Sequence, residues 1–311
     1  MTTLVRIASS FFWIAGSALL LSSCSEEHSG TRYKLYFLGG QSNMDGYGYV
    51  HELPADLNRP ISGVRIFHGN PMPDDSLGGG VGVWTELNPG HGVGFNYDGA
   101  ENSYSERFGV ELTFAQTLLE LDLEANVAII KYSRGGTSID EEAARNFGSW
   151  DPDYEGREGI NQYDHFQTTV ENAMSAGDID GDGADDTLVP SGIIWMQGES
   201  DADVTEEIAE RYQGNLTELV GLIRNALGGG DIPVVVGRIS ESGQEEDGVV
   251  WEYGGIVRTA QAAFVEADGN AALLTSTDEY DYSDPWHYDT DGYIDLGRRF
   301  AEAVFGLNVE H

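Results

Sequence analysis

The chain has 311 residues, and its 53 acidic against 16 basic residues give a formal net charge of −37. Such a charge repels nucleic acid and anionic lipid head groups, so the composition excludes nucleic acid and other polyanions as partners. The acidic residues are spread along the chain, as in a solvated surface suited to salty surroundings, and the 40% hydrophobic content is enough for one sizeable core.

The first residues have the pattern of an export signal. Arg6 precedes an apolar run at 11–21, which is too short for a comfortable membrane span. The run closes in Leu21-Ser22-Ser23-Cys24, which resembles the bacterial lipobox, where the cysteine is lipidated. We therefore expect a lipoprotein signal peptide at residues 1–23 and membrane attachment through lipidated Cys24. An ordinary signal peptide with an incidental cysteine is the alternative.

This pattern predicts a cell envelope lipoprotein of a bacterium, at the outer membrane or the cell surface. Ser25 is not an aspartate, which favours the outer membrane in a bacterium with two membranes. Residues 24–32 are expected to form a polar tether, followed by one domain at 33–311. Because Cys24 is the only cysteine, the chain has no internal disulfide and no candidate catalytic thiol.

From residue 33 onward, short apolar runs alternate with amphipathic helical patterns. The apolar runs, most of them rich in β-branched or aromatic residues, predict strands at 33–38, 127–132, 192–197, 232–239 and 271–275. Apolar residues at helical spacing predict helices at 110–121, 208–223, 256–265 and 294–304. This alternation is typical of an α/β fold with a mostly parallel central sheet covered by helices on both faces. In such sheets, functional sites form at the carboxyl ends of the strands.

Two stretches depart from the alternation. Residues 71–102 are rich in glycine, proline and asparagine and predict a long surface excursion, and residues 146–159 are similar. Trp84, Trp150, Tyr154 and the later Trp286 suit stacking on sugar rings, and they suit packing in a core equally well.

A candidate nucleophile follows the first predicted strand. That strand runs into Gly39-Gly40-Gln41-Ser42-Asn43-Met44. Two glycines before a serine can form a sharp turn that presents the hydroxyl above the sheet. A serine is a weak nucleophile until a base removes its proton, so a histidine is needed. By itself, such a serine is usually part of a plain turn.

The candidate base is one of seven histidines. Asp284 precedes His287 by three residues, in Ser283-Asp284-Pro285-Trp286-His287. In a loop, this spacing lets the carboxylate reach the imidazole Nδ1–H and leaves the other ring nitrogen to act as general base. The same spacing is often incidental when it stands alone.

Two further strand ends supply hydrogen-bond donors. One predicted strand leads into Ser133-Arg134-Gly135-Gly136-Thr137-Ser138, a tight turn whose N–H groups can point at an anion. Another leads into Gln197-Gly198-Glu199-Ser200-Asp201, with an amide side chain at the same level. Acyl transfer requires donors aimed at the developing oxyanion, and both segments offer them. We expect Glu199 and Asp201 to brace loops rather than to act as acids, and Asn43 to brace the segment beside the nucleophile.

As an ordered set, these four motifs resemble those of the sialate O-acetylesterase-like group of SGNH hydrolases, which includes carbohydrate esterase family 6. The likeness runs from about residue 34 to residue 305. It implies a three-layer α/β/α, flavodoxin-like fold and no cofactor for catalysis. It also implies a serine esterase that removes acetyl groups from O-acetylated oligo- or polysaccharides through an acyl-enzyme.

The resemblance also implies roles for single residues. It makes Ser42 the nucleophile, His287 the base and Asp284 the acid that orients the base. It builds the oxyanion hole from the Ser42 N–H, the Gly136 N–H (with Gly135 as a substitute) and the Gln197 amide. The chain departs from the family pattern at Val110, where the family often has proline, and at Trp286, which adds an aromatic ring to the substrate rim.

An acidic loop predicts a metal site of a different kind. The segment Asp178-Ile179-Asp180-Gly181-Asp182-Gly183-Ala184-Asp185-Asp186 resembles a calcium-binding loop, with Asp178, Asp180, Asp182 and Asp186 at positions one, three, five and nine. Val189 stands where a complete EF-hand has its glutamate, so the loop is not an EF-hand. We expect structural Ca²⁺ here, with a solvated acidic turn as the alternative.

Two other functions remain open. A lipase or thioesterase of broader specificity can use the same fold, and a long apolar acyl channel would distinguish it. A lipid-anchored glycan-binding protein that has lost catalysis is the other alternative. The intact set of Ser42, Asp284 and His287 argues against it.

Overall fold

The computed structural model describes residues 29–73, 77–156 and 159–310. The expected signal peptide and Cys24 lie outside these ranges. None of the helices within them has the length and apolar character that a bilayer crossing requires.

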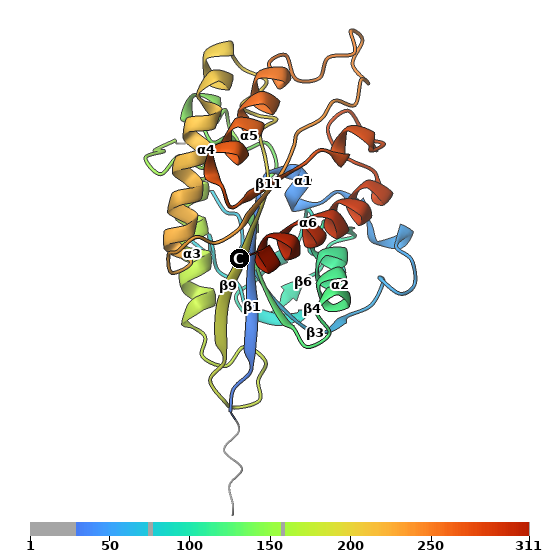
Figure 1. Ribbon diagram of the computed structural model, residues 1–311, viewed down its shortest axis with the longest axis vertical. Helices are drawn as coiled ribbons and strands as arrows, with labels where there is room; N and C mark the ends of the chain where they lie inside the picture. Colours follow the sequence, from blue (N-terminus) through green and yellow to red (C-terminus); the bar gives the residue numbers. More distant parts are fainter. Residues whose placement is uncertain (1–28, 74–76, 157–158, 311) are drawn as a thin grey trace, which may run out of the picture.

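A seven-stranded sheet in the order β11-β10-β9-β1-β8-β3-β4 forms the centre of the fold (Figure 1). Its strands are β1 (Arg32–Gly40), β3 (Ile61–His68), β4 (Trp84–Leu87), β8 (Asn126–Ser133), β9 (Thr187–Met196), β10 (Val234–Gly237) and β11 (Ala271–Leu274). Neighbouring strands are parallel, except that β4 pairs antiparallel with β3 at one edge. The mostly parallel sheet expected from the sequence is confirmed.

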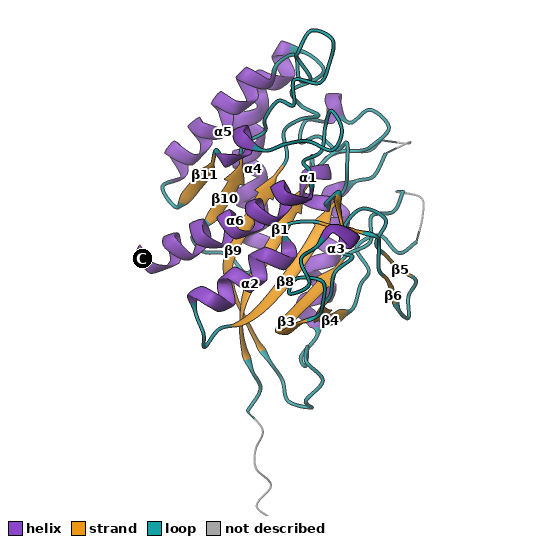
Figure 2. Ribbon diagram, turned by 90° about the vertical axis from the view of Figure 1, so that its right-hand side faces the viewer, coloured by secondary structure: helices purple, strands orange, loops and turns teal. Residues whose placement is uncertain are grey.

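Helices cover both faces of the sheet. One layer consists of α2 (Glu111–Leu121) and α6 (Thr290–Glu310), and the other of α3 (Gln162–Ser175), α4 (Glu206–Ala226) and α5 (Gly254–Asp268). Figure 1 shows the two layers on opposite sides of the sheet, and Figure 2 shows α2 and α6 crossing in front of it. This arrangement confirms the three-layer α/β/α fold.

Alternating side chains of β1 fill the two cores. Leu35 and Phe37 pack toward α3, α4 and α5, whereas Tyr36 and Leu38 pack toward α2 and α6. Successive side chains of a strand point to opposite faces, so a central strand buried on both sides is apolar throughout.

Short elements connect the layers around the carboxyl ends of the strands. They are α1 (Ser42–Asp45), the pair β2 (Gly48–Tyr49) and β7 (Arg107–Phe108), the pair β5 (Asn96–Tyr97) and β6 (Asn102–Ser103), and the 3₁₀ turns η1 (Val50–Glu52), η2 (Glu141–Ala143) and η3 (Ser276–Glu279).

The structure differs from the sequence prediction in two strands of the central sheet, one long helix and two loops. β3, β4 and α3 were not predicted. The expected surface excursion at 71–102 contains β4 and the buried His91 and Phe95, so that prediction was wrong for part of the segment. In the stretch 146–159, Trp150 is fully buried. Such buried side chains are hard to predict in a glycine-rich segment, because one or two apolar residues are enough to fix a long loop.

A buried ion pair supports the end of the sheet where α1 begins. Lys131 of β8 is fully buried, and its Nζ donates to Glu111 Oε2 at 2.8 Å. The same ammonium donates to the backbone oxygens of Asp45, at 2.9 Å, and His91, at 2.8 Å. Its charge is therefore paired and its three donors are used, as a buried lysine requires. The contact ties β8 to α1 and α2.

Candidate active site

Ser42 lies directly after the central strand. β1 ends at Gly40, which has a positive φ of 143°, and a Cβ there would lie 2.0 Å from the Met196 carbonyl oxygen. This turn therefore requires glycine, and it places Ser42 at the first position of α1. Ser42 lines a cavity of about 460 Å³.

His287 and Asp284 form a hydrogen-bonded pair in the loop before α6. The imidazole Nδ1 lies 2.8 Å from Asp284 Oδ2. Asp284 Oδ1 accepts the backbone N–H groups of Trp286 and His287, both at 2.9 Å. An ionised carboxylate only accepts hydrogen bonds, so Nδ1 carries the proton, and in the neutral imidazole Nε2 is the unprotonated nitrogen. The three-residue spacing thus produces the contact expected from the sequence.

The surroundings favour a neutral imidazole beside a charged carboxylate. Burial lowers the pKa of His287 below its ordinary value; Asp284 opposes this shift, and the charge of Arg107 adds to it. Burial alone would raise the pKa of Asp284, but the hydrogen bond from His287 holds it below the ordinary value. At neutral pH the pair is therefore in the protonation states that a general base and its orienting acid need.

Ser42 and His287 line the same cavity, next to Gly135 and Gly136. Among the contacts of the described residues, no hydrogen bond joins the Ser42 hydroxyl to the imidazole. Catalytic hydrogen bonds are often long in a free enzyme and shorten in the complex. The candidate nucleophile and the candidate base are therefore both exposed to the same cavity.

The glycine pair after β8 lies beside the serine. Gly136 has a φ of 79°, and a Cβ there would lie 2.6 Å from the Phe147 ring, so only glycine fits. A Cβ on Gly135 would lie 3.2 Å from the Ser42 Cβ, which shows how closely this loop approaches the serine. Ser42 opens α1, so its own N–H has no acceptor within the helix.

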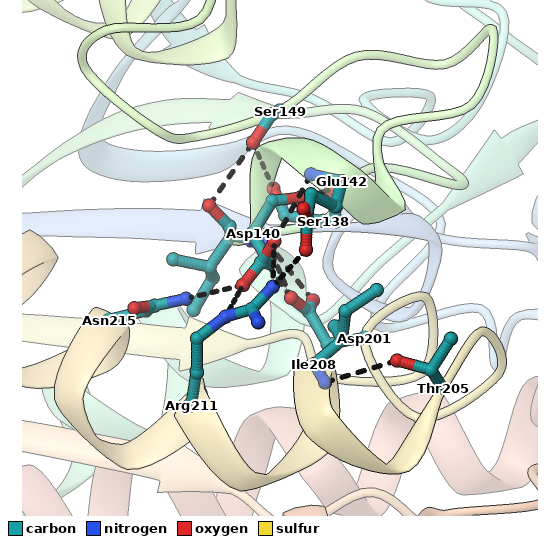
Figure 3. Close-up of polar contacts among 10 residues, drawn as sticks. Ser138, Asp140, Glu142, Ser149, Asp201, Thr205, Ile208, Arg211 and Asn215 are labelled. Atoms are coloured by element: carbon teal, nitrogen blue, oxygen red, sulfur yellow. Dashed lines mark hydrogen bonds and ion pairs between the residues drawn. The ribbon is translucent and has the colours of Figure 1, made fainter.

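The loop that carries Gly136 is anchored from two sides (Figure 3). From α4, Arg211 donates to both carboxylate oxygens of Asp140, at 2.7 and 3.0 Å, and Asn215 adds a bond of 3.1 Å. Asp201 lies in the loop after β9, and its carboxylate accepts the backbone N–H groups of Ile139 and Asp140 in the loop that carries Gly136. These contacts fix the backbone that follows Gly136.

Gln197 lies behind the cavity wall, fully buried, and does not line the cavity. Its Nε2 donates to Asp201 Oδ2 at 2.6 Å, to the Thr137 carbonyl oxygen at 3.1 Å and to Gln41 Oε1 at 3.2 Å. An amide NH₂ has two donor hydrogens, and three acceptors already compete for them. Its oxyanion role stays a prediction, and the contacts favour bracing of the surrounding loops.

Several cavity residues were not identified from the sequence. Gln41 is one: it precedes Ser42 in the motif, and its Oε1 accepts the backbone N–H groups of Gly198 and Ser200. The others are Asp45, Tyr47, Val93, Arg134, Arg145, Phe147, Ser200, Asp203 and Trp251. Of these residues, only Gln41, Arg134 and Ser200 lie inside the sequence motifs. The motifs could have identified these three, and no local pattern pointed to the others.

The aromatic residues divide between the cavity and the core. Trp286 lines the cavity and is 47% exposed. Trp150 and Tyr154 are buried, and Trp84 packs on Phe67 and donates its indole N–H to the Ala173 carbonyl oxygen at 2.9 Å. Of the four candidates for sugar stacking, Trp286 is the one at the cavity.

The acidic loop brings three of its four predicted metal ligands together. Carboxylate oxygens of Asp178, Asp180 and Asp186 lie within 4.8 Å of one another, and Asp182 is not part of this group. Asp180 Oδ2 accepts the Tyr33 hydroxyl at 2.9 Å, and Asp186 Oδ1 accepts the Thr31 N–H at 2.8 Å. Oxygen ligands of this kind suit Ca²⁺, and the loop is tied to the start of β1.

Solved structures with the same fold are similar to this chain. A protein from Arabidopsis thaliana has 21% identity and a TM-score of 0.61, over 88% of this chain and 98% of its own. NanS has 16% identity and a TM-score of 0.56, over 91% and 99%. A carbohydrate acetylesterase from Xanthomonas citri has 17% identity and a TM-score of 0.58, over 89% of this chain and 57% of its own. At these identities the likeness shows the fold.

Sequence comparison gives a more specific result. No curated protein matches significantly. The profile of a family described as "carbohydrate esterase, sialic acid-specific acetylesterase" matches residues 32–306, which is nearly the whole described domain. As the four motifs indicated, the chain belongs to this acetylesterase family of carbohydrate esterases, within the SGNH hydrolases.

Proposed function

We propose that this carbohydrate acetylesterase works through a serine mechanism in which Ser42, His287 and Asp284 form the triad. The observation that carries the proposal is the pair of His287 Nδ1 and Asp284 Oδ2, 2.8 Å apart, in a loop that shares its cavity with Ser42. A glycine-dependent turn holds the serine at the end of the central strand. Both features support a nucleophile and base held on rigid elements.

The reaction follows from these positions. His287 Nε2 takes the proton of the Ser42 hydroxyl as Oγ bonds to the acetyl carbonyl carbon. The resulting oxyanion accepts the N–H groups of Ser42 and Gly136. The intermediate collapses, the C–O bond to the sugar breaks, and His287 returns the proton to the sugar oxygen. Water then attacks the acetyl-serine with His287 again as base, which releases acetate and restores Ser42.

The cavity supports an acetylated sugar as the substrate. Its volume of about 460 Å³ is in the range of small-molecule sites, and the half-exposed Trp286 at its wall offers a ring face for sugar stacking. Charged side chains line the same cavity, at Asp45, Arg134, Arg145 and Asp203. A long acyl chain would be poorly matched to them, so the cavity argues against a lipase or thioesterase.

Outside the site, we propose that the protein is a lipoprotein of the bacterial cell envelope, anchored through Cys24 and facing its glycan from the outer membrane or the cell surface. The lipobox-like sequence supports the anchor. We also propose structural Ca²⁺ at the acidic loop. The proximity of Asp178, Asp180 and Asp186 supports it, and Asp182 would then serve the loop rather than the ion.

Acetate release from a panel of O-acetylated glycans tests the proposed mechanism. Ser42→Ala and His287→Ala should each reduce release to near background, and Asp284→Asn should cost no more than His287→Ala. The double variant of Ser42 and His287 should be hardly worse than either single variant, because the two residues act as one unit. Ser175→Ala, at the exposed end of α3, is the matched control.

Full activity in a folded Ser42→Ala protein would exclude the serine mechanism. No wild-type activity on any glycan of the panel would favour the binding-protein alternative.

A further inference from the structure

A tyrosine lies flat against the imidazole of His287. The rings of Tyr47 and His287 are stacked, with centroids 3.6 Å apart and an angle of 4° between their planes. Both residues line the cavity that contains Ser42. No other ring contact of His287 within the described residues is parallel: Trp286 meets it at 73°, with centroids 6.4 Å apart.

The backbone conformation around Tyr47 determines where this ring lies. Gly46 follows α1 with a φ of 103°, and a Cβ there would lie 2.3 Å from the Gly109 Cα. The chain therefore turns sharply after the helix of Ser42, in a conformation that only glycine adopts without strain. It then enters β2, which pairs with β7. Tyr47 is thus fixed between the segment of the nucleophile and a short sheet.

Arg107 of β7 contacts both the backbone and the ring of Tyr47. Its Nη1 donates to the Tyr47 carbonyl oxygen. Its guanidinium carbon lies 3.5 Å from the ring centroid of Tyr49 and 5.9 Å from that of Tyr47. The guanidinium therefore contacts two rings and one carbonyl group, and Tyr47 has little freedom to leave the imidazole.

We propose that Tyr47 is a positioning residue for catalysis: its ring fixes the plane of the His287 imidazole, while the bond to Asp284 fixes the rotation of the imidazole within that plane. This inference rests on the proposed role of His287 as the base. One hydrogen bond leaves an imidazole free to tilt about the bond, and a parallel ring at contact distance removes that freedom. The ring face also attracts the imidazolium that forms when His287 holds the serine proton.

The charges around His287 act together with this contact. Asp284, on the same loop as His287, favours the imidazolium, whereas Arg107, next to Tyr47, disfavours it. The cavity adds two acidic and two basic side chains, Asp45 and Asp203 against Arg134 and Arg145. Arg145 is already paired with Asp203, at 2.7 Å. Arg134 acts on Asp45, where its charge opposes the rise in pKa that burial causes. Arg107 is the cation whose charge lowers the pKa of His287.

Three variants at Tyr47 separate positioning from other roles. Tyr47→Phe keeps the ring and should keep most of the turnover of a small acetyl ester such as p-nitrophenyl acetate. Tyr47→Leu removes the flat face and should lower kcat by about ten- to a hundred-fold, a typical cost of a misplaced catalytic group, with little change in KM. Tyr47→Met, which fills the same space, should behave like the leucine variant and replaces it if that protein does not fold.

A double-mutant cycle and an NMR measurement decide between positioning and substrate contact. In a His287→Ala background, Tyr47→Leu should have no further effect on the residual rate. A rise in KM, or an added loss in that background, would assign Tyr47 to substrate binding and overturn the proposal. NMR of the imidazole C–H signals requires no turnover. The ring current of Tyr47 should shift the His287 signals in the wild type and in Tyr47→Phe, and that shift should vanish in Tyr47→Leu.

Arg107 supplies a separate readout. Arg107→Gln should raise the titration midpoint of His287 in the NMR experiment and move the acid limb of kcat to higher pH, whereas Arg107→Lys, which keeps the charge, should not. NMR shifts that vanish without any loss of kcat would leave the stack as packing and overturn the positioning role. Because the NMR titration is independent of the chemistry, failure of the serine mechanism itself would appear only in the Ser42→Ala assay.

Discussion

Asn43 and Glu199 join the segment of the nucleophile to the loop after β9, with Asn43 Nδ2 lying 2.9 Å from Glu199 Oε1 and both side chains buried. The same Nδ2 donates to the Trp286 carbonyl oxygen at 3.1 Å, and Asn43 Oδ1 accepts the Tyr293 hydroxyl at 2.8 Å. A single amide therefore connects the helix of Ser42, the loop of His287 and the start of α6. This is the bracing role that the sequence predicted for Asn43 and Glu199.

The first prediction concerns the charge of Glu199. Burial raises its pKa to about 7, and its Oε2 has no hydrogen-bond partner within the described structure. The folded protein thus holds this proton more tightly than the unfolded chain does, so stability is lost as pH rises through the folded value. Glu199→Gln keeps the acceptor for Asn43 and removes the charge. It should reduce the fall in Tm between pH 5.5 and 8 by about 2–4 °C, relative to the exposed control Glu120→Gln. Parallel Tm curves for the two variants would contradict it.

The second prediction concerns the pH dependence of turnover. A base must be neutral to accept the Ser42 proton, and burial lowers the pKa of His287 below 6.5. The kcat/KM of the wild type should therefore rise with pH along an acid limb whose midpoint lies below 6.5, and should level off by neutral pH. A pH profile of hydrolysis of a neutral acetyl ester measures this midpoint. A midpoint above 7 would show that a different group limits the reaction.

The third prediction separates two roles of Gln197. Its buried amide serves Asp201, Thr137 and Gln41, so Gln197→Ala should lower the free energy of unfolding by about 1–3 kcal/mol, as unpartnered buried groups do. Loss of an oxyanion donor would instead cost about a hundred- to a thousand-fold in kcat. We expect the stability loss, with a kcat loss smaller than a hundred-fold. Full stability together with the larger loss of kcat would instead support the oxyanion role.

The fourth prediction tests calcium at the acidic loop. A ligand that binds only the folded state stabilises it by mass action, by about 2.7 kcal/mol at a hundred times its Kd. Chelation should therefore lower the Tm of the wild type. Asp178→Asn with Asp180→Asn keeps oxygen acceptors for the loop but removes two charges, and should abolish the response to chelator. Asp182→Asn, outside the cluster, should retain it. A wild type that is indifferent to chelator has no such ion.

The fifth prediction concerns Cys24. If the thiol carries a lipid, Cys24→Ala should move the protein from the membrane fraction to the soluble fraction, with esterase activity moving in parallel. Cell fractionation followed by immunoblotting measures the distribution. Ser23→Ala, which leaves the cysteine in place, is the control. Membrane association that survives in Cys24→Ala would show that another feature attaches the protein.

The sequence predicted the buried sheet well because its signal is local. The strands β1, β8 and β9 are continuous apolar runs, and their ends carry the glycine motifs. β3 was missed because Gly63 and Arg65 interrupt its apolar pattern. α3 was missed because it buries one narrow face, with Phe166 and Val170, on an otherwise polar helix.

Site residues could be predicted where the residues that interact lie within a few positions of one another in the sequence. The pair Asp284 and His287 is local, so its spacing was informative. Tyr47 and Trp251 reach the cavity only because separate loops converge there, and no local pattern records such convergence. The burial of Trp150 could not be predicted for the same reason, because the packing of an aromatic side chain in a loop depends on partners that are distant in sequence.

The placement of β1 has a consequence for how activity arises during biosynthesis. β1 lies in the centre of the sheet, yet it pairs with β8 and β9, strands made much later, and Asn43 meets Trp286 across 243 residues of sequence. While the chain is still being synthesised, Ser42 therefore exists long before His287, its partner in the proposed triad. Contacts so distant along the chain also form slowly, because each must overcome the entropy of closing a large loop. Under the proposed mechanism, the chain cannot hydrolyse esters until the loop of His287 has reached the cavity that contains Ser42.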